Sequence, residues 1–258
     1  MDGKLFRAYL VELVGTFAFV FFASGLACVN AMTSVTETSP GLTPLATQQP
    51  GLLGVAMGQA LVWLALIAWS APVSGGYLNP AVAIARWVFN RLSSDRLAWF
   101  IDAQILGAVL AGLALQLIFE PAILKTAQFG APYLNTLAFG SLSSGSIWAG
   151  MGIELVLTFF FVLAMFTTTE QAPAPWLSGA VLAAAVLFAG PLTGAGLNPA
   201  RWLGPVFWQM IDGSAGNLAS RQALVYIAGP IVGALLAGAF AFRVYLPARL
   251  EAPKSTGP

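Results

Sequence analysis

The chain has 258 residues, of which 58% are hydrophobic and 8% are charged, and its net charge is +1. A soluble domain carries about 25% charged residues, so this composition excludes an ordinary soluble protein and predicts an all-α integral membrane protein. The chain has no His, one cysteine (Cys28) and no basic or acidic block, which argues against enzymatic chemistry, metal or other cofactors and nucleic-acid partners.

Six apolar stretches are long enough to cross a membrane as helices, which takes roughly 20 residues. The first follows Lys4 and Arg7, as a signal peptide would, but its length and Glu12 favour a membrane span. In chain order the six spans are expected at about residues 6–29, 51–71, 96–119, 147–169, 177–193 and 222–244.

The same tripeptide follows the second span and the fifth span, as Asn79-Pro80-Ala81 and Asn198-Pro199-Ala200. Each copy precedes an apolar segment that is too short to cross a bilayer, at about 80–90 and 199–211. Asn is a favoured N-cap and Pro a favoured first helical residue, so each tripeptide predicts a helix that starts from a loop. Irregular backbone at membrane depth occurs only where it is buried in protein or lines a cavity. Two re-entrant half-helices therefore indicate a pore.

The two halves of the chain resemble each other within one domain that covers 1–258. The first repeat covers about 5–119 and the second about 147–245, with a tail at 246–258. Because each repeat has three full spans, the second copy enters the membrane from the opposite side. Such an inverted repeat places corresponding features face to face near the midplane. Small residues at Gly107, Gly112, Gly233 and Gly238 are expected to allow close helix packing.

Orientation is predicted from the Lys and Arg residues. Eight of these residues fall on the side of the two termini and three on the other side, so both termini are expected in the cytoplasm. The short termini favour a bacterial inner membrane.

Residues 74–82 and 193–201 resemble the two signature loops of the aquaporin, or major intrinsic protein, family. The resemblance extends over about residues 5–245. It implies six helices and two half-helices, a homotetramer in the lipid bilayer, and a pore for water and small neutral solutes in each protomer.

Asn79 and Asn198 are the expected central donors of the pore. Capping uses the side-chain oxygen of Asn, which leaves the amide NH2 to face the lumen. The positive ends of both half-helix dipoles meet at the same place and disfavour cations and protons. The alternative is that both residues are helix caps only.

Arg201 directly follows the second tripeptide, and a cation inside a membrane domain is a functional candidate. In the family this position is the arginine of the outer constriction; the alternative is an arginine near the headgroups. Spacing from the signature loops assigns the other constriction positions to Gln59, Val186 and Ala195. Because these residues include no aromatic ring or His, a constriction wider than that of strict water channels is expected. A shift of one residue would place Gly58 or Ala60 at the position assigned to Gln59, and Gln59 would then make a polar contact between helices.

Glu12 and Glu154 are carboxylates inside spans, one in each repeat, and they need partners because an unpaired buried charge is too costly. In the family these carboxylates accept hydrogen bonds from the two loops; the alternative is a proton-coupling role in a transporter. Tyr77 replaces the usual His of the first loop and is expected in the inner vestibule, or else in packing.

The sequence therefore predicts a passive channel for water and small uncharged solutes. One alternative is a glycerol or metalloid-acid facilitator, and another is a secondary transporter with a broken-helix site. Ala195 stands where mercury-sensitive relatives carry a cysteine, so weak inhibition by mercurials is expected.

Overall fold

The computed structural model describes residues 2–36, 49–167, 175–214 and 218–247. Helices in this part of the chain form the six predicted spans. The first five are α1 (Gly3–Thr36), α2 (Gly51–Ser70), α4 (Ser94–Ile118), α7 (Ser144–Thr167) and α8 (Pro175–Thr193). The sixth covers Arg221–Tyr245 and joins the end of α10 (Leu218–Ala223), the π-helical η3 (Leu224–Ala228), α11 (Gly229–Phe240) and the π-helical η4 (Ala241–Tyr245).

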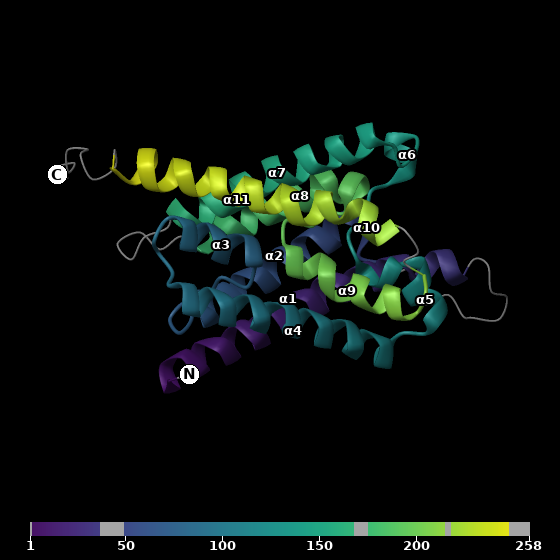
Figure 1. Ribbon diagram of the computed structural model, residues 1–258. Coiled ribbons are helices and arrows are strands. Elements are labelled where there is room, and N and C mark those ends of the chain that lie inside the picture. Colours follow the sequence, from purple (N-terminus) through teal and green to yellow (C-terminus); the bar gives the residue numbers. More distant parts are fainter. Residues whose placement is uncertain (1, 37–48, 168–174, 215–217, 248–258) are drawn as a thin grey trace, which may run out of the picture.

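The six spans confirm the predicted all-α membrane fold, and all but the first end within a few residues of the expected positions. The first helix is longer than expected, because α1 continues to Thr36. It packs against α2 and α4 inside the bundle, which is the behaviour of a membrane span rather than of a signal peptide. In Figure 1 the beginning of α1 and the end of α11 lie at one end of the bundle, and α5, α6 and α10 lie at the other.

Two half-helices, α3 (Pro80–Val88) and α9 (Pro199–Ile211), begin inside the bundle. α3 packs against α4 and α11, whereas α9 packs against α1 and α4. α3 ends earlier than expected because Phe89 leaves the helical conformation and Asn90 adopts a left-handed φ of 57°.

The two repeats use the same packing contact. α1 packs on α4 in the first repeat as α7 packs on α11 in the second. At each contact a glycine lies directly on the backbone of the facing helix: Gly107 on Leu13 and Gly233 on Leu155, so that a Cβ at either glycine would overlap the facing carbonyl. Small residues allow membrane helices to approach this closely.

The segment 120–146, between the third and fourth predicted spans, contains α5 (Pro121–Thr126), the 3₁₀ turn η2 (Gln128–Gly130) and α6 (Thr136–Phe139). Each α-helix here has a local start signal, because Pro121 is a first-turn proline and the Asn135 side chain caps α6. These helices are short enough that hydrophobic periodicity does not reveal them.

Candidate functional site

Asn79 and Asn198 cap the two half-helices at the centre of the bundle. Their Oδ1 atoms accept hydrogen bonds from the backbone N–H groups of Ala81 and Ala200, both at 2.9 Å. Both asparagines are buried, and each adopts an extended backbone before the proline that opens its helix. The repeated tripeptide thus produces two equivalent capped helix starts.

The same two side chains also connect the two loops. Asn79 Nδ2 donates to the carbonyl oxygen of Leu197 at 3.0 Å, and Asn198 Nδ2 donates to that of Leu78 at 2.9 Å. A primary amide has two N–H donors. One donor of each asparagine therefore holds the opposite loop, and only the second donor of each, rather than the whole NH2 group, remains for the predicted contact with a molecule in the pore.

Leu78 and Leu197 present these carbonyls from a left-handed backbone, with φ of 49° and 52°. This conformation costs a non-glycine residue about 1–2 kcal/mol, so the surroundings must hold it in place. Glu12 Oε2 accepts from the N–H of Leu78, and Glu154 Oε2 accepts from that of Leu197, both at 2.7 Å.

Glu12 and Glu154 are fully buried and make equivalent sets of hydrogen bonds. Glu12 Oε1 accepts from Ser74 Oγ at 2.6 Å and from the N–H of Tyr77 at 3.0 Å. Glu154 Oε1 accepts in the same way from Thr193 Oγ1 at 2.6 Å and from the N–H of Gly196 at 2.9 Å. Each carboxylate therefore fixes the loop that precedes its half-helix.

Sequence reasoning missed the hydroxyl and amide partners of these carboxylates. Ser74 and Thr193 stand at the same distance before the two signature asparagines, so comparison of the two loops would have found them. Gln104 Nε2 donates to Glu12 Oε2 at 2.7 Å, whereas the second repeat has a Tyr226 hydroxyl that donates to the carbonyl of Thr193 at 2.6 Å. Gln104 and Tyr226 have no equivalent partner in the other repeat, so comparison of the two repeats would not have revealed them.

A cavity of about 440 Å³ brings together three of the four expected constriction residues, Gln59, Val186 and Arg201. We name it the outer cavity because the predicted orientation places it on the side away from the cytoplasm. Ala195 does not line this cavity. It is buried with a left-handed φ of 48°, and its neighbour Gly194 reaches the cavity instead.

Two residues that line this cavity carry buried polar atoms with no hydrogen-bond partner in the described part of the chain. These atoms are Gln59 Oε1 and the Nε and Nη1 atoms of Arg201, from side chains that are only 2% and 3% exposed. Asn30 Oδ1 has no partner either, and Asn30 lines the same cavity. Asn30 was missed because nothing in its sequence context distinguishes it from a polar residue at the end of a span.

Tyr77 is buried next to Phe100, and its expected place in the inner vestibule stays a prediction. Its ring is 9% exposed and lies 5.4 Å, centroid to centroid, from that of Phe100.

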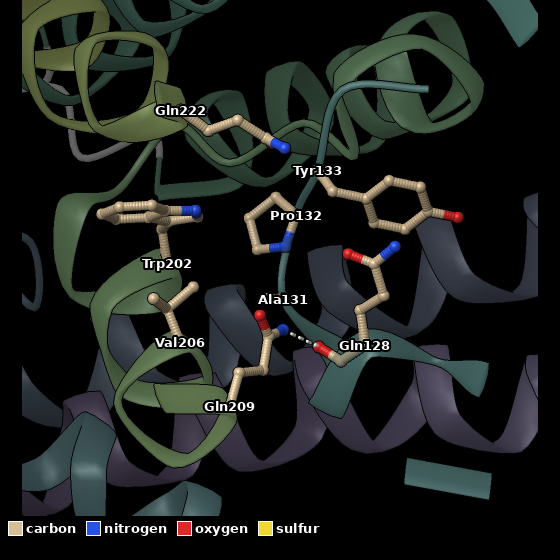
Figure 2. Close-up of a pocket in the computed structure, with 8 residues that line it drawn as sticks. All are labelled: Gln128, Ala131, Pro132, Tyr133, Trp202, Val206, Gln209 and Gln222. Atoms are coloured by element: carbon tan, nitrogen blue, oxygen red, sulfur yellow. Dashed lines mark hydrogen bonds between the residues drawn. The ribbon is translucent and has the colours of Figure 1, made fainter. Parts of the chain in front are cut away.

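The segment before α6 lines the outer cavity at Ala131, Pro132 and Tyr133. Figure 2 shows one of its contacts, in which Gln209 Nε2 donates to the Gln128 carbonyl. In a second contact, the N–H of Leu134 donates to Gln222 Oε1. The space between these side chains is about 10 Å³, which is close to the minimum for one water molecule. These two hydrogen bonds hold the segment in place beside the outer cavity.

Comparison with known proteins shows which protein family the chain belongs to. The family model for major intrinsic proteins matches residues 2–242. Relatives include aquaporin TIP4-4 of Zea mays, 35% identical over 92% of this chain and 86% of its own length. Aquaporin AqpM of Methanothermobacter marburgensis is 33% identical over 91% of this chain and 95% of its own. Aquaporin NIP1-2 of Oryza sativa subsp. japonica is 32% identical over 91% of this chain and 70% of its own length.

The fold also matches a solved structure, the X-ray structure of the aquaglyceroporin from Plasmodium falciparum. The TM-score is 0.75 at 22% identity, over 96% of this chain and all of the other. The relatives named here come from plants, an archaeon and a protozoan, so an origin in a bacterial inner membrane stays a prediction. The chain is a multi-pass membrane protein of the major intrinsic protein family, the family of the aquaporin channels.

Proposed function

We propose that the protein is a passive channel for water and small uncharged solutes that excludes ions and protons. One observation carries this proposal: Gln59 and Arg201 line the outer cavity, and Gln59 Oε1 and the Nε and Nη1 atoms of Arg201 are buried without a protein partner. An unsatisfied buried polar group costs about 1–3 kcal/mol, more when charged. A passing water or solute that bonds to these atoms relieves that cost.

Rejection of ions and protons is supported by the centre of the bundle. The N-termini of α3 and α9 meet where Asn79 and Asn198 bond to the opposite loops. The two positive dipole ends disfavour a cation there, and the remaining N–H of each amide orients a water oxygen. Arg201 adds a full positive charge on the outer side.

Passage of solutes larger than water is supported by the chemistry of the outer cavity. Gln59 and Asn30 offer acceptor oxygens, and Arg201 offers donors. This combination suits solutes that both donate and accept hydrogen bonds, such as urea and glycerol. The glycerol or metalloid-acid facilitator is therefore the second candidate function, and it differs from the first only in the size of the favoured solute.

Stopped-flow light scattering on proteoliposomes tests the proposal. We expect rapid osmotic shrinkage together with measurable entry of urea and glycerol. In a Gln59→Leu variant, solute entry falls several-fold more than water flux, because the leucine removes an acceptor without narrowing the path. The matched control is Thr126→Val: it lines the same cavity, but its hydroxyl already donates to the Ala122 carbonyl at 2.9 Å.

Fast shrinkage without solute entry in the wild-type protein would contradict the wide constriction. Saturable uptake coupled to an ion gradient would favour the secondary transporter instead. Replacing Arg201 with Val should admit cations, and unchanged ion selectivity would remove Arg201 from the filter.

We also infer from family membership that the protomers form a homotetramer with both termini in the cytoplasm. Native mass spectrometry of the detergent-extracted protein is expected to give four chains, and a monomer as the only species would contradict the inference.

A further inference from the structure

At the end of the bundle where α1 begins, four arginines lie against phenylalanine rings. The guanidinium carbons of Arg86, Arg91, Arg96 and Arg243 are between 4.3 and 5.7 Å from the centroids of those rings. A guanidinium that is stacked by its face keeps its N–H edge available for hydrogen bonds. The cluster is thus held in place by aromatic contacts and not by carboxylates.

The charge of this cluster is not neutralised by nearby acids. Residues 86–96 contain three arginines and one acidic residue, Asp95. Within the part of the chain that the structure describes, the one ion pair is Lys125–Asp212, and neither of its residues belongs to this cluster. The arginines therefore suit an external anion.

An open hollow of about 650 Å³ lies between the end of α3 and the start of α4. Its walls carry Arg91, Arg96 and Ser93, and buried Leu92 contributes to its lining. The Ser93 side chain makes no capping hydrogen bond to α4. Two guanidinium groups and a free hydroxyl around one hollow match the oxygens of a phosphate.

The surroundings of the hollow are those of a membrane interface. Trp87 and Trp99 are 41% and 42% exposed, and Trp99 follows Arg96 by three residues on the same face of α4. Tryptophan is enriched at the level of lipid headgroups. Exposed Val88 next to Trp87 continues the apolar surface on which acyl chains would lie.

We propose that this hollow binds the phosphate of an anionic phospholipid headgroup, held by Arg91, Arg96 and Ser93. Arg86 and Arg243 raise the local positive potential, and the exposed tryptophans accommodate the glycerol and upper acyl region. This site is separate from the proposed pore and adds a lipid dependence to the stability of the protein.

The test compares thermal unfolding and native mass spectrometry of the full chain in detergent with added phosphatidylglycerol or phosphatidylcholine. Phosphatidylglycerol should bind and stabilise the wild-type protein more strongly. Arg91→Gln/Arg96→Gln should weaken this binding about 30-fold, from roughly 1 kcal/mol for each basic residue at a lipid surface. The control Lys4→Gln/Arg7→Gln removes the same charge at the same end but outside the hollow, and should retain most of the binding.

Equal weakening in both double variants would overturn the site, because it would indicate diffuse charge attraction. Equal stabilisation of the wild-type protein by inorganic phosphate would overturn the assignment to a lipid. Water permeability of the Arg91/Arg96 variant is measured in parallel and should match that of the wild-type protein, so failure of this site is distinguishable from failure of the channel proposal.

Discussion

At the scale of single residues, Asn79 and Asn198 each use one amide for two structural bonds. The oxygen caps a half-helix and one N–H holds the opposite loop. The chemistry of the centre of the bundle therefore depends on a donor that aspartate lacks, although aspartate is an equally good N-cap.

An Asn79→Asp variant isolates that donor. The cap is retained, but a carboxylate then faces the Leu197 carbonyl, so we expect the free energy of unfolding to fall by about 1–3 kcal/mol and cation leakage to appear. Asn135→Asp is the matched control, because Asn135 also caps a helix and donates to a carbonyl, that of Pro191, at the protein surface. Similar losses of stability in the two variants would show that the central bond has no special role.

Glu154 is predicted to be a structural carboxylate. Replacing it with Leu leaves the Thr193 hydroxyl and two backbone N–H groups buried without an acceptor. We expect a loss of at least about 3 kcal/mol of stability, measured by thermal unfolding in detergent. Glu120→Leu, at an exposed position, should change stability by no more than about 0.5 kcal/mol. Retained stability but lost proton coupling in the Glu154 variant would instead support the transporter alternative.

Cys28 is fully buried against Leu115, Leu124 and Phe129. A mercurial reagent that enters the outer cavity does not meet this thiol, so we expect water permeability to be almost unchanged by mercury. Strong inhibition that disappears in Cys28→Ala would contradict this expectation.

At the scale of elements, the glycine contacts set how closely the spans approach. Gly233→Ala places a methyl group on the Leu155 carbonyl and must separate α7 from α11, at a cost of about 1–3 kcal/mol. Gly152→Ala is the control, because a Cβ there meets no atom within 4 Å and alanine is the better helix former. Thermal unfolding should show a loss in the first variant and none in the second.

The long elements and both half-helices were predictable because their signals are local and strong: apolar runs of membrane length, and an Asn-Pro helix start. The short α5 and α6 were not, since a helix of four to six residues carries no periodicity. The carboxylate roles followed from resemblance, and their hydroxyl partners Ser74 and Thr193 could have been found by comparing the two loops. The crossed asparagine bonds could not, because they depend on tertiary contacts between distant loops.

In the molecule as a whole, the two repeats supply matching halves of one centre, and we propose that their differences determine the selectivity of the channel. The carboxylate, hydroxyl and asparagine contacts occur twice. Arg201 and Gln59 line one outer cavity, and the residue at the position equivalent to Arg201 in the first repeat is Val82. The supporting contacts are thus the same in both repeats, whereas the proposed filter residue Arg201 occurs only in the second.

The proposed pore should pass water and reject protons. Both properties can be measured together by recording water flux and proton flux in proteoliposomes that contain a pH-sensitive dye, over a range of temperatures. We expect water permeability well above that of protein-free vesicles, with a low activation energy and linear dependence on the osmotic gradient, and proton flux equal to that of protein-free vesicles. Water permeability no higher than that of empty vesicles, or proton flux that rises with water flux, would contradict the proposal.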